Sequence, residues 1–203
     1  MTNIIRLKGI LRDIQFSHKI KDIEYNKANL IVQRRDGKED VLNVRFKKFS
    51  NPYSDGQVVA LEGNVRSYSR VISDHNKVDI YVFTYFDIPE LNDDDTEIVN
   101  EFEIEGRICK MGELRTTQSG KQNIHFILAN NLIIGDNEQK LNSYLPCIAW
   151  GNLAREIATL HVNNKVTIVG ELHSREYAKT LPDGECEIRV AHELVVTGIE
   201  VEE

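Results

Sequence analysis

The sequence has no long hydrophobic run and no pattern of an export signal. None of its apolar stretches approaches the roughly 20 residues that a helix needs to span a bilayer. The first residues, MTNIIRLKG, have neither the apolar core nor the small-residue cleavage site of a secretory signal. We therefore expect a cytoplasmic protein without membrane contact. Its 41% hydrophobic and 28% charged residues suit a globular fold.

Cysteine is also scarce. The 203 residues contain three, Cys109, Cys147 and Cys186. They are odd in number and widely separated, and each falls within a predicted strand. We expect buried, reduced thiols rather than a disulfide framework or a zinc site.

Catalytic motifs are missing as well. The sequence contains no GxSxG, GxGxxG, Walker loop or HExxH pattern, and its six histidines include no i, i+4 pair. The acidic run 93–95 lacks the turn-forming glycine and the distal ligand of a metal loop, and adjacent carboxylates of this kind are usually solvated. These absences favour a protein that is not an enzyme and that holds no metal or cofactor.

The formal net charge of −7 argues at first against a nucleic-acid partner. Its distribution weakens that argument. Residues 1–88 hold 15 basic and 11 acidic residues, a balance of +4, residues 89–98 hold five acids, and residues 99–203 hold 10 basic and 16 acidic residues. Binding depends on a local cationic face rather than on the total, so the net charge does not decide the question.

The segment 144–177 predicts a strand, one short helix and a second strand. In residues 144–150 two aromatics and a branched aliphatic share one face, and small apolar groups share the other. Gly151 breaks the strand and Asn152 can cap a helix of about three turns, whose apolar stripe is Leu153, Ile157 and Leu160. Alternation returns at 165–177. A small closed β-barrel with one helix across its end satisfies this order.

The first half predicts strands joined by turns. Alternation indicates strands near 3–12, 27–35, 41–47, 58–67 and 77–88, with Asp36-Gly37 as a hairpin turn. Residues 13–25 have no clear period and predict a loop or an irregular strand. The segment KKFSNPYSDG stands where the second half has its helix, and Pro52 with two turn-forming clusters forbids one there. The acidic, aperiodic segment 89–98 is typical of a linker.

The two halves repeat each other. LKG at 7–9 corresponds to IEG at 104–106, and VVALEGNVRSYS at 58–69 corresponds to KVTIVGELHSRE at 165–176. The offsets of 97 and 107 residues differ by about the length of the missing helix. An internal repeat of this kind implies two copies of one barrel.

Three segments in the second half resemble a known family. PCIAWGNLA, VTIVGELHSREY and GRICKMGELRTTQSGKQNIHFILANN are similar to the core of the bacterial single-stranded DNA-binding proteins, over residues 100–199. The resemblance implies an OB-fold. With the repeat, it predicts an all-β protein with one short helix and two tandem five-stranded Greek-key OB-fold barrels. We expect a divergent barrel at 1–88 without the helix, an acidic linker at 89–98, and a barrel of the family's type at 99–203.

The resemblance also implies binding residues in the second half. Trp150, Tyr144 and Tyr177 fall where the family stacks bases, and a strand face of aromatics otherwise packs a core or a dimer interface. Cations that contact the phosphate backbone in the family are implied at Arg107, Arg115 and Lys121, which on their own would be solvated surface charges. Arg175 lies beside Tyr177 and is a candidate for clamping a phosphate or stacking on a base.

In the first half, Arg45 and Lys47 are placed where the second half has aromatics. Arg66, Tyr68 and Arg70 are expected to alternate outward from the fourth strand, joined by Arg34 or Arg35. We hypothesise that the first barrel contributes charge and the second contributes stacking. The aromatic row Tyr81, Phe83 and Tyr85 lies on a strand that is apolar on both sides, which favours packing against another barrel over ligand binding.

The resulting prediction is non-catalytic, largely sequence-independent single-stranded DNA binding in replication, recombination or repair, with RNA not excluded. Because family members work with four barrels, we expect a homodimer. The alternative is an OB-fold accessory of a replication or primosome complex that mainly binds protein. The chain ends at GIEVEE, without the family's Gly/Pro/Gln-rich tail, so tail-mediated recruitment of replication enzymes is not expected.

Overall fold

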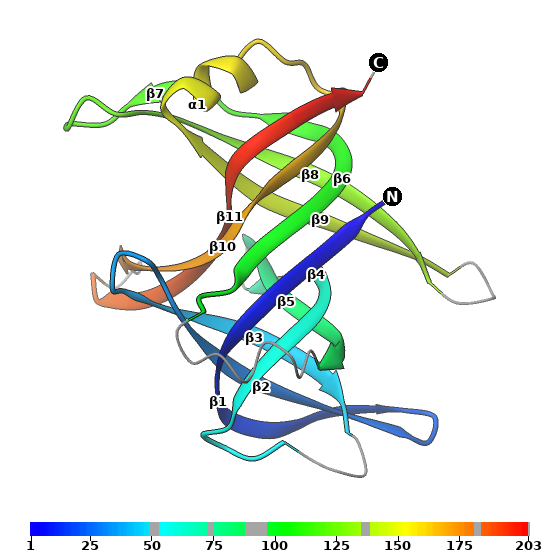
Figure 1. Cartoon of the computed structure of the whole chain (residues 1–203). Coiled ribbons are helices and arrows are strands. Elements are labelled where there is room, and N and C mark those ends of the chain that lie inside the picture. Colours follow the sequence, from blue (N-terminus) through cyan, green and yellow to red (C-terminus); the bar gives the residue numbers. More distant parts are fainter. Residues whose placement is uncertain (49–52, 73–74, 88–96, 135–138, 181–183, 203) are drawn as a thin grey trace.

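The computed structural model describes residues 1–48, 53–72, 75–87, 97–134, 139–180 and 184–202. These residues form eleven strands and one helix (Figure 1). In chain order they are β1 (Asn3–Ile20), β2 (Ile23–Gln33), β3 (Glu39–Lys47), β4 (Val58–Ile72), β5 (His75–Asp87), β6 (Asn100–Met111), β7 (Arg115–Thr116), β8 (Gln122–Ile134), β9 (Gln139–Trp150), α1 (Gly151–Ile157), β10 (Lys165–Thr180) and β11 (Cys186–Glu202).

The strands close into two barrels with the same topology. In barrel 1 the strand order is β2-β3-β5-β4-β1, and β1 also pairs with β2, so the sheet closes on itself. Barrel 2 has the order β6-β10-β11-β9-β8, and β6 also pairs with β8. Each barrel contains one parallel pairing, β3 with β5 and β11 with β9, as the Greek-key order requires. The predicted all-β fold of two barrels is confirmed.

The internal repeat extends to the strand register. In barrel 1, Gly63 of β4 lies across from Ile5 of β1, and in barrel 2, Gly170 of β10 lies across from Phe102 of β6. Each glycine stands at a bulge, and a Cβ there would lie 2.2 Å from the carbonyl oxygen of Phe83 or 2.0 Å from that of Val195. Only glycine tolerates this approach, which explains why the repeat keeps it.

The barrels join along a seam where β1 pairs with β6 in antiparallel fashion, from Asn3↔Ile104 to Leu7↔Asn100. At the seam each barrel uses an asparagine side chain in place of a backbone amide. Asn3 donates through Nδ2 to Val65 O and accepts from Val65 N, both at 2.8 Å. Asn100 makes the same pair of bonds to Leu172, both at 2.9 Å. The asparagines therefore continue each barrel's ladder past the point where β1 and β6 turn to pair with each other.

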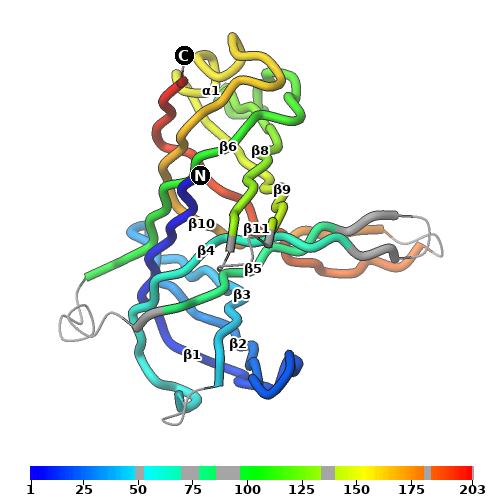
Figure 2. Tube along the Cα trace, turned by 90° about the vertical axis from the view of Figure 1, so that its right-hand side faces the viewer, coloured from blue at the N-terminus to red at the C-terminus, as the bar shows by residue number. Residues whose placement is uncertain are grey.

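Two long hairpins project from the same side of the molecule, β4–β5 (arm 1) and β10–β11 (arm 2) (Figure 2). Each arm contacts the other barrel, and one serine in each arm makes an equivalent hydrogen bond. Ser67 of arm 1 accepts a hydrogen bond from Tyr144 N at 2.7 Å, and Ser174 of arm 2 accepts one from Val41 N at 2.9 Å. These equivalent contacts relate the barrels by an approximate twofold arrangement.

The helix differs from its prediction in length and in its cap. It spans Gly151–Ile157, two turns rather than three, and Trp150 is its N-cap without a side-chain capping bond. Asn152 does not cap the helix; its Oδ1 accepts a hydrogen bond from Arg155. Leu160 lies beyond the helix because the chain tightens after Ile157, yet it still packs against the core.

Other expectations are corrected in the same way. Residues 13–25 belong to a long β1–β2 hairpin whose register shifts near Asp13 and Ser17, so the irregular strand was the right alternative. All three cysteines are free, but only Cys147 is buried, and burial raises the pKa of its thiol. Cys109 and Cys186 are exposed. Most of the expected linker, with its acidic run, lies outside the described residues.

Candidate nucleic-acid interface

The first candidate surface is a groove in barrel 2 where β9 meets α1. Trp150, at the end of β9, is 42% exposed, and Tyr144 on the same strand is 51% exposed. A cavity of about 400 Å³ is lined by Lys121 from the β7–β8 loop, by Gln122 at the start of β8, by Trp150 and by Arg155 from α1. We call this surface the Trp150 groove. It combines an open indole ring with two cations, as single-stranded nucleic acid requires.

Arg155 is a member of the groove that the sequence did not indicate. Its Nη1 donates to Gln122 Oε1 at 2.7 Å, and its Nη2 donates to Asn152. Both partners are neutral amides, so the guanidinium keeps its charge available. A sequence signal existed, since Arg155 follows Gly151 by about one helical turn and therefore projects beside the strand end that carries Trp150.

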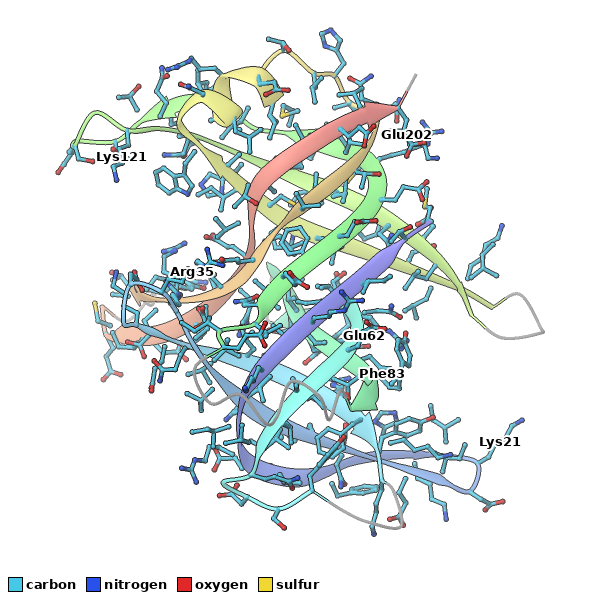
Figure 3. All side chains as sticks on the ribbon, in the orientation of Figure 1. Lys21, Arg35, Glu62, Phe83, Lys121 and Glu202 are labelled. Atoms are coloured by element: carbon cyan, nitrogen blue, oxygen red, sulfur yellow. The ribbon has the colours of Figure 1, made fainter. Side chains whose placement is uncertain are left out.

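Of the predicted backbone cations, two lie near the groove and one does not. Arg115 is exposed on β7, and Lys121 lies exposed at the loop tip (Figure 3). Arg107 lies on β6 across from Lys165, and its Nη1 donates to Asn163 O at 2.9 Å. It is not among the residues that line the Trp150 groove, so the structure does not group it with Lys121.

On arm 2, the predicted binding residues Arg175 and Tyr177 contact each other, and Arg175 also contacts a carboxylate of the same arm. Arg175 lies over the Tyr177 ring, with 5.7 Å from its Cζ to the ring centroid. The same guanidinium forms an ion pair with Glu193 at 3.2 Å. Tyr177 is half-buried. Because Glu193 already neutralises Arg175, this pair offers less to a phosphate than an unpaired cation would.

The second candidate surface is the outer face of barrel 1, across β2, β3, β5 and β4. It alternates aromatic and cationic side chains, and we call it the barrel 1 face. Its members are Tyr25, Lys27, Arg45, Lys47, Arg66, Tyr68, Tyr81, Phe83 and Tyr85. Phe83 marks its place on β5 in Figure 3. Lys27 and Lys47 are exposed, and no carboxylate of the described residues pairs with Lys27, Arg45 or Lys47 in an ion pair.

Arginine side chains cover the rings of this face. Arg45 Cζ lies 4.1 Å from the Tyr81 centroid and 4.9 Å from the Tyr68 centroid. Arg66 Cζ lies 4.0 Å from the Phe83 centroid, and its Nη2 donates to the Tyr85 hydroxyl at 2.7 Å. The rings of Tyr81, Phe83 and Tyr85 are therefore packed by arginines of their own barrel, and the expected packing of this row against another barrel stays a prediction.

Arg66 and the neighbouring arginines also correct the sequence reading. Arg66 shares the outer face with Tyr68, which is 38% exposed, but Arg66 itself is only 9% exposed because Phe83 and Tyr85 cover it. The side chain of Arg70 lies outside the described side chains. Arg34 is held by Asp40 and donates to Ser174 O at 2.7 Å, where it supports the contact between the barrels.

Arg35 lies on a different surface. It lines a cavity of about 1140 Å³ over the seam, together with Arg6 and five glutamates: Glu62, Glu97, Glu101, Glu103 and Glu171. Arg6 is already paired with Glu62 at 2.8 Å and with Glu101 at 3.6 Å. This face is acidic and repels phosphate.

The register also tests which positions correspond between the barrels. The parallel pairing of Val44 with Val82 matches that of Cys147 with Leu194. Lys47 therefore corresponds to Trp150, as expected, but Arg45 corresponds to Ile148, which is not aromatic. The barrel 1 face carries rings as well as cations, and the hypothesised division into a charged barrel and a stacking barrel stays a hypothesis.

These features define a class, a protein of two tandem OB-fold barrels. The model of the single-strand binding protein family matches residues 99–201, half of the chain, and the chain belongs to that family. Two solved structures are similar over 100% of this chain at 16% identity and TM-score 0.72. They are the wild-type single-stranded DNA binding protein from Thermus aquaticus, covered over 93%, and a deletion mutant of it, covered over 95%. At this identity they show the fold alone.

A search of curated proteins finds no match to this sequence. Among the described residues, no helix is long and apolar enough to cross a membrane. The same part of the chain holds no group of three His, Cys, Asp or Glu residues that could bind a metal ion.

Proposed function

We propose that the protein binds single-stranded DNA without strong sequence preference and without catalysing a reaction. The Trp150 groove carries this proposal, because an exposed indole lines one cavity with two cations that no carboxylate of the described residues neutralises. Bases stack on such a ring whatever their identity, and the cations track the phosphates. Membership of the single-strand binding protein family supports the same function.

Within this proposal, Trp150 and Tyr144 stack bases, and Arg115, Lys121 and Arg155 contact the backbone. Tyr177 and Arg175 extend the path along arm 2. The barrel 1 face adds Arg45, Lys47 and Tyr68. We assign barrel 1 to residues 1–88 and barrel 2 to residues 99–203, joined by the linker at 89–98, and place the protein's work in replication, recombination or repair.

Trp150 is the only tryptophan, so tryptophan fluorescence reports on barrel 2 alone. An oligo-dT of about 35 nucleotides is longer than the stretch that two barrels cover at about 4–16 nucleotides each, so it can fill both barrels in a titration. We expect quenching of Trp150 and a binding constant that falls with salt. A titration with neither effect would remove the proposal. Binding that tolerates both Trp150→Ala and high salt would favour the protein-interaction accessory, and a matched oligo-rU separates RNA from DNA.

The homodimer is part of the same proposal. Two chains would supply the four barrels with which family members work. Light scattering of the full chain, alone and with oligo-dT, tests this directly. We expect twice the 23.3 kDa of one chain, and a mass of one chain at all concentrations would contradict it.

A further inference from the structure

A cavity of about 580 Å³ lies where the barrel 1 face meets arm 2. Barrel 1 contributes Arg45, Tyr68 and Tyr81 to its lining, and β11 of barrel 2 contributes Val190 and His192. Its volume is within the range of small-molecule sites. Neither barrel forms it alone.

The wall that comes from barrel 2 is fixed in place. His192 Nε2 lies 2.8 Å from Val41 O, and Ser174 Oγ accepts a hydrogen bond from Val41 N at 2.9 Å. Both bonds end on the backbone of one residue of β3. The arm therefore holds its position over the barrel 1 face, and the cavity exists before any ligand enters it.

The cation in the cavity is preorganised but unneutralised. Arg45 lies over the Tyr68 and Tyr81 rings, whose centroids are 5.8 Å apart. Two aromatic neighbours restrict the side chain, and its guanidinium makes no ion pair with a carboxylate of the described residues. An arginine held in this way offers its N–H groups to a phosphate at little entropic cost.

The same positions carry a different chemistry in barrel 2. By register, Tyr68 corresponds to Arg175 and Tyr81 to Glu193. Barrel 2 has an ion pair there, at 3.2 Å, whereas barrel 1 has two rings and a free cation. The equivalent positions of barrel 2 therefore do not repeat the ring and cation chemistry of this cavity.

Two carboxylates also line the cavity, Asp13 and Asp79. Asp13 Oδ2 accepts a hydrogen bond from Asn29 Nδ2 at 3.0 Å. Carboxylates accept hydrogen bonds from the amino and imino groups of bases but repel phosphate. This places a base inside the cavity and its phosphate beside Arg45, with Lys27 next to it on the neighbouring strand.

We propose that this cavity is a nucleotide subsite, which takes one unpaired base against Tyr68 and Tyr81 and one phosphate on Arg45. The proposal rests on the proposed function, because it assumes that the protein binds a single strand. It adds that a nucleotide here touches both barrels. Binding at barrel 1 is then coupled to the position of arm 2.

Tyr81→Leu tests the subsite, with Tyr81→Phe as the matched control that keeps the ring. Fluorescence anisotropy of labelled oligo-dT of about 35 nucleotides measures total affinity, and Trp150 quenching measures barrel 2 separately. We expect Tyr81→Leu to weaken binding roughly fivefold to 150-fold, the value of one stacked base, and Tyr81→Phe to stay within about twofold. Trp150 quenching should persist in both variants.

Photocrosslinking of the unaltered protein provides a second test that does not depend on a substitution. Oligo-dT containing 5-iodouracil should crosslink to peptides that contain Tyr68 or Tyr81. Crosslinks at Tyr144 and Trp150 alone, together with normal affinity of Tyr81→Leu, would overturn the subsite and leave the proposed function intact. Wild-type protein that neither binds oligo-dT nor shows quenching would instead overturn the proposed function itself.

Discussion

The salt dependence of DNA binding should separate the free cations of barrel 1 from the paired cations of the seam. Arg45 and Lys47 lie on the outer face of β3, and no carboxylate of the described residues forms an ion pair with either. The double substitution Arg45→Gln/Lys47→Gln removes both charges and keeps side chains of similar length. If each cation neutralises one phosphate, both contacts are lost.

The expected magnitude follows from counterion release. Each phosphate contact on a single strand contributes about 0.7 to the slope of log K against log salt, so the slope should fall by about 1.4. Between about 50 and 200 mM salt, the wild-type protein should then lose roughly sevenfold more affinity than the double variant. Anisotropy titrations with labelled oligo-dT over this range measure the slope directly.

Arg6→Gln/Lys165→Gln is the matched control, with the same loss of two charges. Arg6 is paired with Glu62 at 2.8 Å, and Lys165 is paired with Glu105 and Glu202, both at 2.6 Å. These cations are already neutralised, so their removal should leave the slope unchanged. The reasoning fails if both variants lose the same slope, which would indicate net charge alone, or if the Arg45/Lys47 variant keeps the wild-type slope.

Three further predictions concern stacking, the seam and pH. Trp150→Leu should cost about 1–3 kcal/mol of oligo-dT binding by anisotropy, while Trp150→Phe retains most of it; equal losses would mean that the ring does not stack. Asn3→Ala should lower the free energy of unfolding, measured in urea, by about 2–4 kcal/mol. Asn3 is 2% exposed, and its removal leaves the backbone N–H and C=O of Val65 without hydrogen-bond partners. Asn100→Ala should cost only about 1–2 kcal/mol, since water reaches its half-buried site; the reverse order would contradict this account. A hydrogen bond from Lys165 lowers the pKa of Glu105, so the ionised Glu105 stabilises the fold fully above the ordinary pKa of a glutamate, and this stabilisation is lost as pH falls through the lowered pKa. Glu105→Gln should therefore flatten the fall of the urea midpoint between about pH 6 and pH 3. A fall as steep as that of the wild-type protein would refute this.

Local patterns predicted which side chains of barrel 2 share a face. Alternation in a single strand fixes which side chains share a face, and Tyr144 and Trp150 are both exposed on β9 as the period of two requires. The repeated glycines were equally informative, because the close approach at Gly63 and Gly170 excludes any other residue. Features that depend only on the backbone geometry of one segment, such as the face of a strand or a glycine at a bulge, can therefore be predicted from the sequence.

The barrel 1 face was not predictable by the same means. Arg45, Tyr68 and Tyr81 come from three strands, and alternation does not state which strands are neighbours. The parallel pairing of β3 with β5 brings Arg45 beside Tyr81, and that pairing follows only from closure of the barrel. Arg66 was misread for the same reason, since nothing in its own strand indicates that Phe83 and Tyr85 cover it.

The two barrels make the same side-chain hydrogen bonds to backbone atoms, but they differ in the side chains that face outward. Asn3 and Asn100 make the same two bonds across the seam, and Ser67 and Ser174 make the same bond between arm and barrel. These contacts end on backbone atoms, so they place no demand on the neighbouring outward side chains. The outer positions of β4 and β5 could therefore acquire rings and a free arginine while their counterparts in β10 and β11 acquired an ion pair, at no cost to the shared scaffold. A single strand of nucleic acid that crossed both barrels would consequently meet two surfaces of different chemistry. The asparagine hydrogen bonds at the seam and the serine hydrogen bonds between arm and barrel would hold these surfaces at a fixed distance.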